Sequence, residues 1–274
     1  MIASMTAAFR KLHESGCFVI PNPWDIGSAR YLARLGFRAL ATTSSGFAFS
    51  RGLPDSPKAV SREMMLAHVA EMVGAAGLPV NADFQNGYAD EPEDVAESVL
   101  RCVATGVAGL SIEDATGNAN APLYELRAAT ERIAAARSAI DRSGAGVLLT
   151  ARAECYLVGQ EDPLRESIRR LTAYAAAGAD VLYAPGVRDR EEIAAMVRAV
   201  HPKPVNVLMF ADTGLRVSDL AELGVRRVSV GSSLARSAWT GFIRAAKAIA
   251  EEGSFAGFEG NVPFGDLDGF FRNW

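Results

Sequence analysis

Two short apolar runs in this chain end in carboxylate and amide side chains. Residues 79–88 carry Asp83 and Gln85, and residues 109–114 end in Glu113 and Asp114. Each run is typical of a buried strand, and oxygen ligands of this kind suit a hard cation such as Mg²⁺. Strand ends also carry Asp as a turn or helix-cap residue. Two successive sites favour a shared cation pocket at one end of a sheet over that simpler interpretation.

Polar side chains follow other apolar runs of the chain in the same way. They are Asn22, Trp24 and Asp25 after 17–20, Thr43, Ser44 and Ser45 after 39–44, and Arg152 and Glu154 after 146–152. The carboxyl ends of parallel strands share one edge, so we expect these side chains to gather in one place. For Arg152 the alternative is an ordinary salt bridge with Glu154 or Glu113.

The elements that would position these residues alternate regularly along the chain. Strands are expected at 17–20, 39–44, Val80, 109–114, 146–152, 180–184, 204–209 and 227–231. Helices are expected at 3–15, 26–35, 62–75, 92–104, 124–140, 163–177, 190–200, 217–223 and 239–251, with 45–61 as a long loop. Strand–helix alternation requires a parallel sheet, and eight units favour an α/β fold closed into a (β/α)₈ TIM barrel. No Gly-x-Gly-x-x-Gly follows the first strand, so a dinucleotide-binding fold has no support.

Composition excludes several functional classes. The chain has 274 residues, 49% of them hydrophobic, and a formal net charge of −4 without a basic run, which disfavours nucleic-acid binding. No apolar stretch approaches the roughly 20 residues that span a bilayer, and the N-terminus lacks a signal-peptide pattern. The three cysteines and three histidines have no disulfide or zinc spacing, so we expect a cytoplasmic protein.

We expect one domain over residues 1–274, with the barrel at about 16–240 and a C-terminal tail at about 241–274. From residue 253 on, the tail holds five Phe and one Trp. So many aromatic side chains would not stay solvated in a monomer. We expect them to pack against the barrel or against a partner subunit, since no basic amphipathic face accompanies them that would suit a membrane.

An ordered set of motifs gives these residues a family context. The motifs are Asn22-Pro-Trp-Asp-Ile-Gly-Ser-Ala-Arg30, Thr42-Thr-Ser-Ser-Gly46, Leu53-Pro-Asp55, Ala82-Asp83 through Asn86-Gly-Tyr88, Ile112-Glu-Asp114 and Thr150-Ala-Arg152. Together, over about residues 10 to 240, they resemble the isocitrate lyase / phosphoenolpyruvate mutase superfamily. The resemblance implies a barrel that binds Mg²⁺, with Mn²⁺ as the alternative, and acts on an α-keto acid through an enolate. It also implies a last helix swapped between subunits of a homodimer or homotetramer, which would account for the tail.

The resemblance also implies roles for individual residues. Asp83, Gln85 and Glu113 stand where the family holds its metal. Asp55, Glu113 and Arg152 stand at catalytic positions, with Arg152 gripping the substrate carboxylate. The substrate pocket would comprise Trp24, Asp83, Arg152, the N–H groups of Ser44, Ser45 and Gly46, and Asn118 or Asn120 from the mobile gate at 115–122.

Three departures from the family pattern bear on function. Gln85 replaces an acidic residue common in relatives, which predicts weaker Mg²⁺ binding. The gate reads Thr116-Gly-Asn-Ala-Asn-Ala-Pro122, without the Lys-Lys-Cys-Gly-His of isocitrate and methylisocitrate lyases and without the Lys-x-Asn-Ser of the mutase and phosphonopyruvate hydrolase. The usual lyase acid is therefore missing, and Tyr88, Tyr156 and Tyr183 are the alternative proton donors.

We therefore expect a Mg²⁺-dependent lyase that cleaves a carbon–carbon bond in a small α-keto acid or 2-hydroxy carboxylate. Decarboxylation of an oxaloacetate-like substrate needs no strong protein acid until the enolate is protonated, and a methylisocitrate lyase-like retro-aldol step is the variant. The alternatives are a phosphonate-acting relative and a keto-acid-binding protein with little catalysis. A direct comparison of candidate substrates separates these hypotheses.

Overall fold

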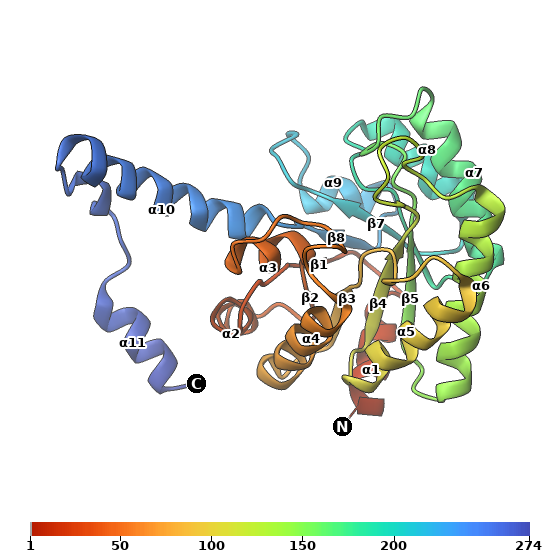
Figure 1. Ribbon diagram of the computed structural model, residues 1–274, viewed down its shortest axis with the longest axis horizontal. Helices are drawn as coiled ribbons and strands as arrows, with labels where there is room; N and C mark the ends of the chain where they lie inside the picture. Colours follow the sequence, from red (N-terminus) through yellow and green to blue (C-terminus); the bar gives the residue numbers. More distant parts are fainter. Residues whose placement is uncertain (1) are drawn as a thin grey trace. The chain divides into compact units, whose positions relative to one another are not determined.

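The computed structural model describes residues 2–274, with side chains described from Ser4 onward. The chain divides into two compact units, one reaching to Ser232 and the other formed by Ser233–Trp274. Figure 1 labels their helices and strands.

The first unit is built on a sheet of eight parallel strands. They are β1 (Phe18–Ile20), β2 (Leu40–Ala41), β3 (Val80–Asp83), β4 (Gly109–Glu113), β5 (Leu148–Arg152), β6 (Val181–Tyr183), β7 (Val205–Leu208) and β8 (Arg227–Ser229). The sheet order β1-β8-β7-β6-β5-β4-β3-β2 brings the first and last strands together. The Ala41 N–H donates to the Pro21 carbonyl at 3.0 Å, which bridges the remaining seam between β1 and β2. The expected (β/α)₈ barrel is confirmed.

Helices surround this sheet on its outer face (Figure 1). They are α2 (Ile26–Arg34), α3 (Ser44–Ser50), α4 (Arg62–Ala76), α5 (Pro92–Ala104), α6 (Leu126–Ser143), α7 (Pro163–Ala176), α8 (Arg190–Val200) and α9 (Val217–Glu222). Side-chain caps explain several of their starts: Asp25, Ser61 and Asp189 each accept hydrogen bonds from backbone N–H groups of the following turn. Left-handed Gly77 and Gly144 close α4 and α6.

The expected loop at 45–61 is wrong in its first part, because residues 44–50 form α3. The Thr43 side chain caps this helix by accepting from the Gly46 N–H at 3.2 Å. The expected strand at 39–44 accordingly shrinks to Leu40–Ala41. The β-branched threonines favour a strand by composition, but a hydroxyl at the helix N-cap decides the local structure.

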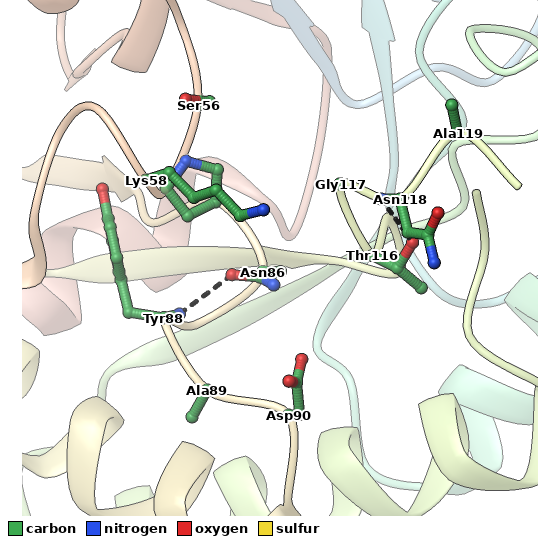
Figure 2. A pocket seen from close by; sticks show the side chains of 11 residues that line it. Ser56, Lys58, Asn86, Tyr88, Ala89, Asp90, Thr116, Gly117, Asn118 and Ala119 are labelled. Carbon is green, nitrogen blue, oxygen red and sulfur yellow. Dashed lines mark hydrogen bonds between the residues drawn. The ribbon is translucent and has the colours of Figure 1, made fainter. Parts of the chain in front are cut away.

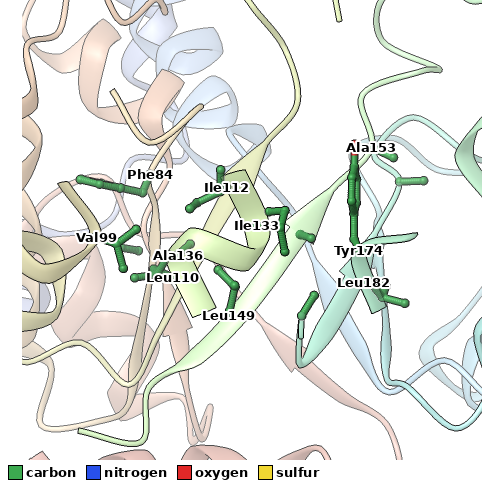
Figure 3. Close-up of a cluster of buried hydrophobic side chains, with 14 of the residues drawn as sticks. Phe84, Val99, Leu110, Ile112, Ile133, Ala136, Leu149, Ala153, Tyr174 and Leu182 are labelled. Carbon is green, nitrogen blue, oxygen red and sulfur yellow. The ribbon is translucent and has the colours of Figure 1, made fainter. Parts of the chain in front are cut away.

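The main core lies between the strands and the covering helices. Figure 3 shows Leu110, Ile112 and Leu149 of the strands beside Ile133 of α6 and Tyr174 of α7, all of them buried. Burying an aliphatic side chain of this size contributes about 1.5–3 kcal/mol. The strand ends are therefore fixed by a close-packed layer.

A smaller cluster closes the amino-terminal end of the barrel. Helix α1 (Ile2–Leu12) supplies Phe9, which packs with Phe18, Leu148 and Val181 from the first residues of their strands. This end is filled, so the carboxyl ends of the strands are left for the site.

The second unit consists of α10 (Ser233–Glu252), a short 3₁₀ turn (Ala256–Phe258) and α11 (Phe264–Arg272). The helix expected at 239–251 begins six residues earlier in the structure, at Ser233. Large apolar side chains of this unit, such as Phe242 and Phe264, are 61% and 84% exposed. Coverage of these side chains by a partner subunit stays a prediction. No helix within residues 2–274 has the length and apolarity needed to cross a membrane.

Candidate active site

Three neighbouring strands end in charged residues that converge at the carboxyl end of the barrel. Asp83 ends β3, Glu113 ends β4 and Arg152 ends β5. Strand pairing sets Glu113 directly beside Arg152. Their convergence was the central prediction from the sequence, and the barrel brings it about.

The Arg152 guanidinium lies at the centre of this group. Its nitrogens are 2.8 Å from Asp83 Oδ1, 3.1 Å from Glu113 Oε2 and 2.8 Å from Glu154 Oε1. The Arg152 side chain is 13% exposed and the Glu154 side chain 5%. The salt bridges with Glu154 and Glu113 that the sequence left as an alternative are therefore present in this structure. We call Asp83, Glu113, Arg152 and Glu154 the carboxylate–arginine centre.

Negative charge exceeds positive charge in this centre. Burial raises the pKa of Glu113 to about 8; Arg152 opposes the rise, while Glu154 and Asp83 add to it. Burial also raises the pKa of Glu154. One guanidinium thus faces three carboxyl groups, and the surplus favours a proton or an additional cation.

Gln85 and Asp55 extend the centre toward the mouth of the barrel. Gln85 Nε2 donates to Asp55 Oδ1 at 3.2 Å, and the backbone carbonyl of Gln85 accepts from the Glu113 N–H at 2.9 Å. Partial burial, followed by the charge of Asp83, raises the pKa of Asp55. Gln85 is 3% exposed, and its Oε1 has no hydrogen-bond partner among the described residues. A buried acceptor without a donor is able to accept from a donor group or to coordinate a cation.

Gln85 also has an unusual backbone. Its φ is +45°, and that of Tyr88 is +58°, in the left-handed region that residues other than Gly rarely adopt. Such conformations cost about 1–3 kcal/mol each and persist where the surroundings impose them. The segment between these residues is therefore held in place from outside.

Arg132 of α6 is the residue that holds it, and nothing in the sequence distinguished it. Its side chain is 1% exposed, and its guanidinium donates to the carbonyls of Asn86, Ala89 and Asp90. It also lies 3.9 Å from the ring centre of Tyr124. The Tyr124 hydroxyl in turn donates to Asp90. From sequence alone, an arginine within a helix is expected to be a solvated surface charge. The contact of Arg132 with the 86–90 segment is therefore seen only in the folded structure.

A second buried network supports the centre from behind. Asp114 accepts from the Glu154 N–H at 2.9 Å, from Arg170 at 3.0 Å and from the Tyr174 hydroxyl at 2.5 Å. With all of these donors in place, Asp114 positions Glu154 and leaves no free oxygen directed at a substrate.

The N–H groups of 44–46, expected as a carboxylate cradle, lie at the start of α3. The Ser44 N–H donates to Asp83 Oδ2 at 2.9 Å, and the Gly46 N–H donates to Thr43. These two donors are thus used inside the protein, and Ser44 ties Asp83 to the start of α3. A substrate carboxylate held by Ser44, Ser45 and Gly46 remains a prediction.

A cavity of about 520 Å³ lies between the loops that follow Asp55, β3 and β4. Its lining residues come from three loops, and Figure 2 shows them: Ser56, Pro57, Lys58, Asn86, Tyr88, Ala89, Asp90, Thr116, Gly117, Asn118 and Ala119. Asn118 of the expected gate lies on its wall, whereas Trp24 is half-buried in the loop after β1.

The donor set suits a hard divalent cation, although Arg152 now occupies its middle. Among residues 2–274 no three His, Cys, Asp or Glu side chains form a ready metal cluster. Mg²⁺ keeps several waters and takes only one or two carboxylates directly, so a sparse set of oxygens fits it. The unpartnered oxygen of Gln85 and the carboxyl groups of Asp83 and Glu113 supply such oxygens.

Comparison with known proteins places the chain in a family. The phosphoenolpyruvate phosphomutase family model matches residues 9–250. An uncharacterised protein of Mycobacterium tuberculosis (strain H37Rv) is 36% identical, with 89% of each chain covered. The oxaloacetate decarboxylase of Pseudomonas entomophila is 32% identical, with 82% of this chain and 77% of that one covered.

Solved structures agree with this placement. A lyase or mutase candidate from Burkholderia cenocepacia J2315 is 51% identical with a TM-score of 0.93, covering 98% of this chain and 96% of that one. Oxaloacetate acetylhydrolase in complex with oxalate is 27% identical with a TM-score of 0.85, covering 98% and 94%. The family model spans most of the sequence, as the motifs predicted, and this chain therefore belongs to the phosphoenolpyruvate phosphomutase family within the isocitrate lyase / phosphoenolpyruvate mutase superfamily.

Proposed function

We propose that this protein is a lyase that cleaves a carbon–carbon bond in a small α-keto acid or 2-hydroxy carboxylate through an enolate. The observation that carries the proposal is the carboxylate–arginine centre at the open end of the barrel. An anionic substrate head and a cation can both be held there. The names of two relatives, which refer to oxaloacetate, support a keto acid as the head group.

Arg152 binds the substrate carboxylate in this proposal. Its planar guanidinium matches a carboxylate with two parallel N–H donors. Because it is paired with Asp83, Glu113 and Glu154, it is already oriented before substrate arrives. Substrate binding then exchanges some of these ion pairs for contacts with the substrate carboxylate. The Arg152 side chain is already ordered, so binding does not have to order it.

Asp83, Gln85 and Glu113 would hold a divalent cation, Mg²⁺ or Mn²⁺, with Asp55 beside them. When bound, such a cation acts as a Lewis acid that stabilises an enolate oxygen. The Arg152 contacts orient Asp83 and Glu113, and the Asp55 hydrogen bond orients Gln85. The gate at 115–122 would exclude water while the enolate forms.

Decarboxylation of an oxaloacetate-like substrate is the reaction that we favour. The gate carries no Lys, Cys or His that would serve as a lyase acid, and loss of CO₂ leaves an enolate that needs a proton only afterwards. A methylisocitrate lyase-like cleavage is the nearest variant. The phosphonate-acting alternative is supported by the family's name, and the keto-acid-binding alternative by Gln85 at the metal position.

The test is a comparison of substrates under one set of conditions. The protein is incubated with oxaloacetate, isocitrate, methylisocitrate and phosphonopyruvate, with Mg²⁺ or with EDTA, and products are followed by NMR. We expect pyruvate from oxaloacetate, lost in EDTA and in Arg152→Ala but kept in Arg127→Ala, whose ion pair with Glu131 lies on the exposed face of α6. Turnover of phosphonopyruvate alone would favour the phosphonate alternative, and binding without any turnover would favour the binding protein.

We also propose a cytoplasmic homodimer or homotetramer in which the last helix is swapped between subunits. All three cysteines are free, as a reducing compartment requires. The exposed aromatic side chains of α10 and α11 supply the apolar surface that a partner subunit would cover.

A further inference from the structure

The cavity at the carboxyl ends of β3 and β4 has one cationic wall. Its lining loops follow Asp55 and the strands β3 and β4, and these strands end in Asp83 and Glu113 of the centre. Under the proposed function, the chain of a ligand held at Arg152 would extend from the strand ends toward this cavity. At about 520 Å³ the cavity lies within the range of small-molecule sites.

Lys58 is the cation in this wall. Figure 2 shows its side chain extending from the 56–58 loop toward Gly117 and Asn118 of the gate, with its amino group inside the ring of lining residues. Within the described residues no carboxylate lies at ion-pair distance from Lys58. Its charge is therefore available to a ligand.

The other charged side chain of the lining set is already engaged. Asp90 accepts from the Tyr124 hydroxyl, and its carbonyl is bound by Arg132. Asn86 is used as well, since its oxygen accepts from the Tyr88 N–H and its amide donates to Tyr124. Lys58 thus remains as the uncommitted charged donor of the lining set.

We propose that Lys58 binds a distal carboxylate of the substrate and so favours 2-oxo dicarboxylates over 2-oxo acids with an uncharged chain. The placement of the head group rests on the proposed function. Arg152 recognises the common 2-oxo acid head, whereas Lys58 distinguishes a dicarboxylate from an uncharged chain of equal length. One site would thus use Arg152 to recognise the 2-oxo acid head and Lys58 to select the group at the far end of the chain.

The size of the effect follows from the exposure of Lys58. The residue is exposed, so solvent and salt screen its charge. Exposed ion pairs are typically worth 0.2–1 kcal/mol, which corresponds to a preference of up to about fivefold. We expect about three- to fivefold tighter binding of the dicarboxylate, falling toward equal binding in 0.5 M salt.

The experiment uses two ligands that differ only in the distal group, 2-oxoglutarate and 2-oxopentanoate. Their dissociation constants are measured by calorimetry in Mg²⁺ buffer for the full-length protein and for Lys58→Met and Lys11→Met. Lys11 is an exposed lysine of α1, at the opposite end of the barrel, and serves as the matched control. Lys58→Met should abolish the preference for 2-oxoglutarate and leave 2-oxopentanoate binding unchanged, whereas Lys11→Met should change neither.

A preference that survives in Lys58→Met, or an equal loss for both ligands, would overturn the proposal. So would equal binding of both ligands by the unmodified protein. Oxalate, which has the head group without a chain, tests the proposed function separately. If Arg152→Ala loses oxalate binding and the Lys58-dependent preference for 2-oxoglutarate is observed, the proposed function and the role of Lys58 are both supported. Failure of oxalate to bind the unmodified protein overturns the head-group assignment, even where the Lys58-dependent preference persists.

Discussion

Gln85 donates its amide N–H to Asp55 Oδ1 at 3.2 Å, and this contact directs the Gln85 side chain toward the mouth of the barrel. The same contact leaves the Gln85 oxygen buried without a donor among the described residues. A glutamate at this position could not donate to Asp55 and would add a second negative charge beside it. The amide therefore lowers the charge of the site while keeping one oxygen for a cation.

Gln85→Glu should tighten Mg²⁺ binding by about tenfold, because a nearby charge of this kind is worth about 1.4 kcal/mol. Without metal the variant should be less stable, since its carboxylate would face Asp55. Calorimetric Mg²⁺ titration measures the first effect, and melting temperature in EDTA measures the second. Gln160→Glu, at an exposed loop position, adds the same charge elsewhere and should alter neither. Unchanged affinity in Gln85→Glu would remove Gln85 from the metal site.

The barrel and the convergence of Asp83, Glu113 and Arg152 were predictable because both depend on local patterns. Apolar runs alternating with amphipathic segments specify a parallel sheet, and its carboxyl ends must meet. The partners of Arg152 were predictable only in part. Glu113 and Glu154 are close to it in register or in sequence, but Asp83 is 69 residues away.

Two features were missed, one because two local preferences compete and the other because its contacts are long-range. Helix α3 follows from the Thr43 cap, which competes with the strand preference of the threonine pair. Arg132 binds carbonyls more than forty residues away, and its role depends on how α6 packs against the 86–90 turn. Such long-range hydrogen bonds become visible only once the fold is known.

Arg132→Met should destabilise the protein by about 3 kcal/mol, because one buried and two partly buried carbonyls lose a charged donor. The left-handed backbone at Gln85 and Tyr88 should then relax, and Mg²⁺ binding should weaken as well. Urea unfolding and metal titration measure the two effects. Arg127→Met removes an exposed arginine from the same helix and should change stability by less than about 0.5 kcal/mol. Equal losses in the two variants would contradict the holding role of Arg132.

The C-terminal unit should mediate assembly. Phe264→Ser replaces a side chain that is 84% exposed, so a monomer would gain solubility without losing stability. If a partner subunit covers it, the variant should dissociate toward monomer, as sedimentation velocity would show. Leu157→Ser, at a 55% exposed residue of the first unit, is the control and should keep the parent mass. A monomeric parent protein would refute the proposed assembly.

His68 should make stability depend on pH below neutrality. Its ring stacks on Phe47 at 4.0 Å between centres, and burial, followed by the charge of Arg51, lowers the pKa of His68 to about 4. The unfolded chain takes up this proton near pH 6.5, whereas the folded protein resists it until about pH 4. Stability from the neutral ring is therefore complete above pH 6.5 and is lost as the pH falls through that interval, by about 2 kcal/mol at pH 5.

His68→Phe keeps the stacked ring and removes the titration. Unfolding free energies measured by urea at pH 7.5 and pH 5 should fall by about 2 kcal/mol less in His68→Phe than in the unmodified protein. Carboxylates titrate equally in both proteins, and so does His13, whose pKa burial lowers to about 3. The difference between the two proteins therefore isolates His68. Parallel losses in both would mean that the fold does not lower the pKa of His68, with Asp25 as the nearby charge that offsets burial.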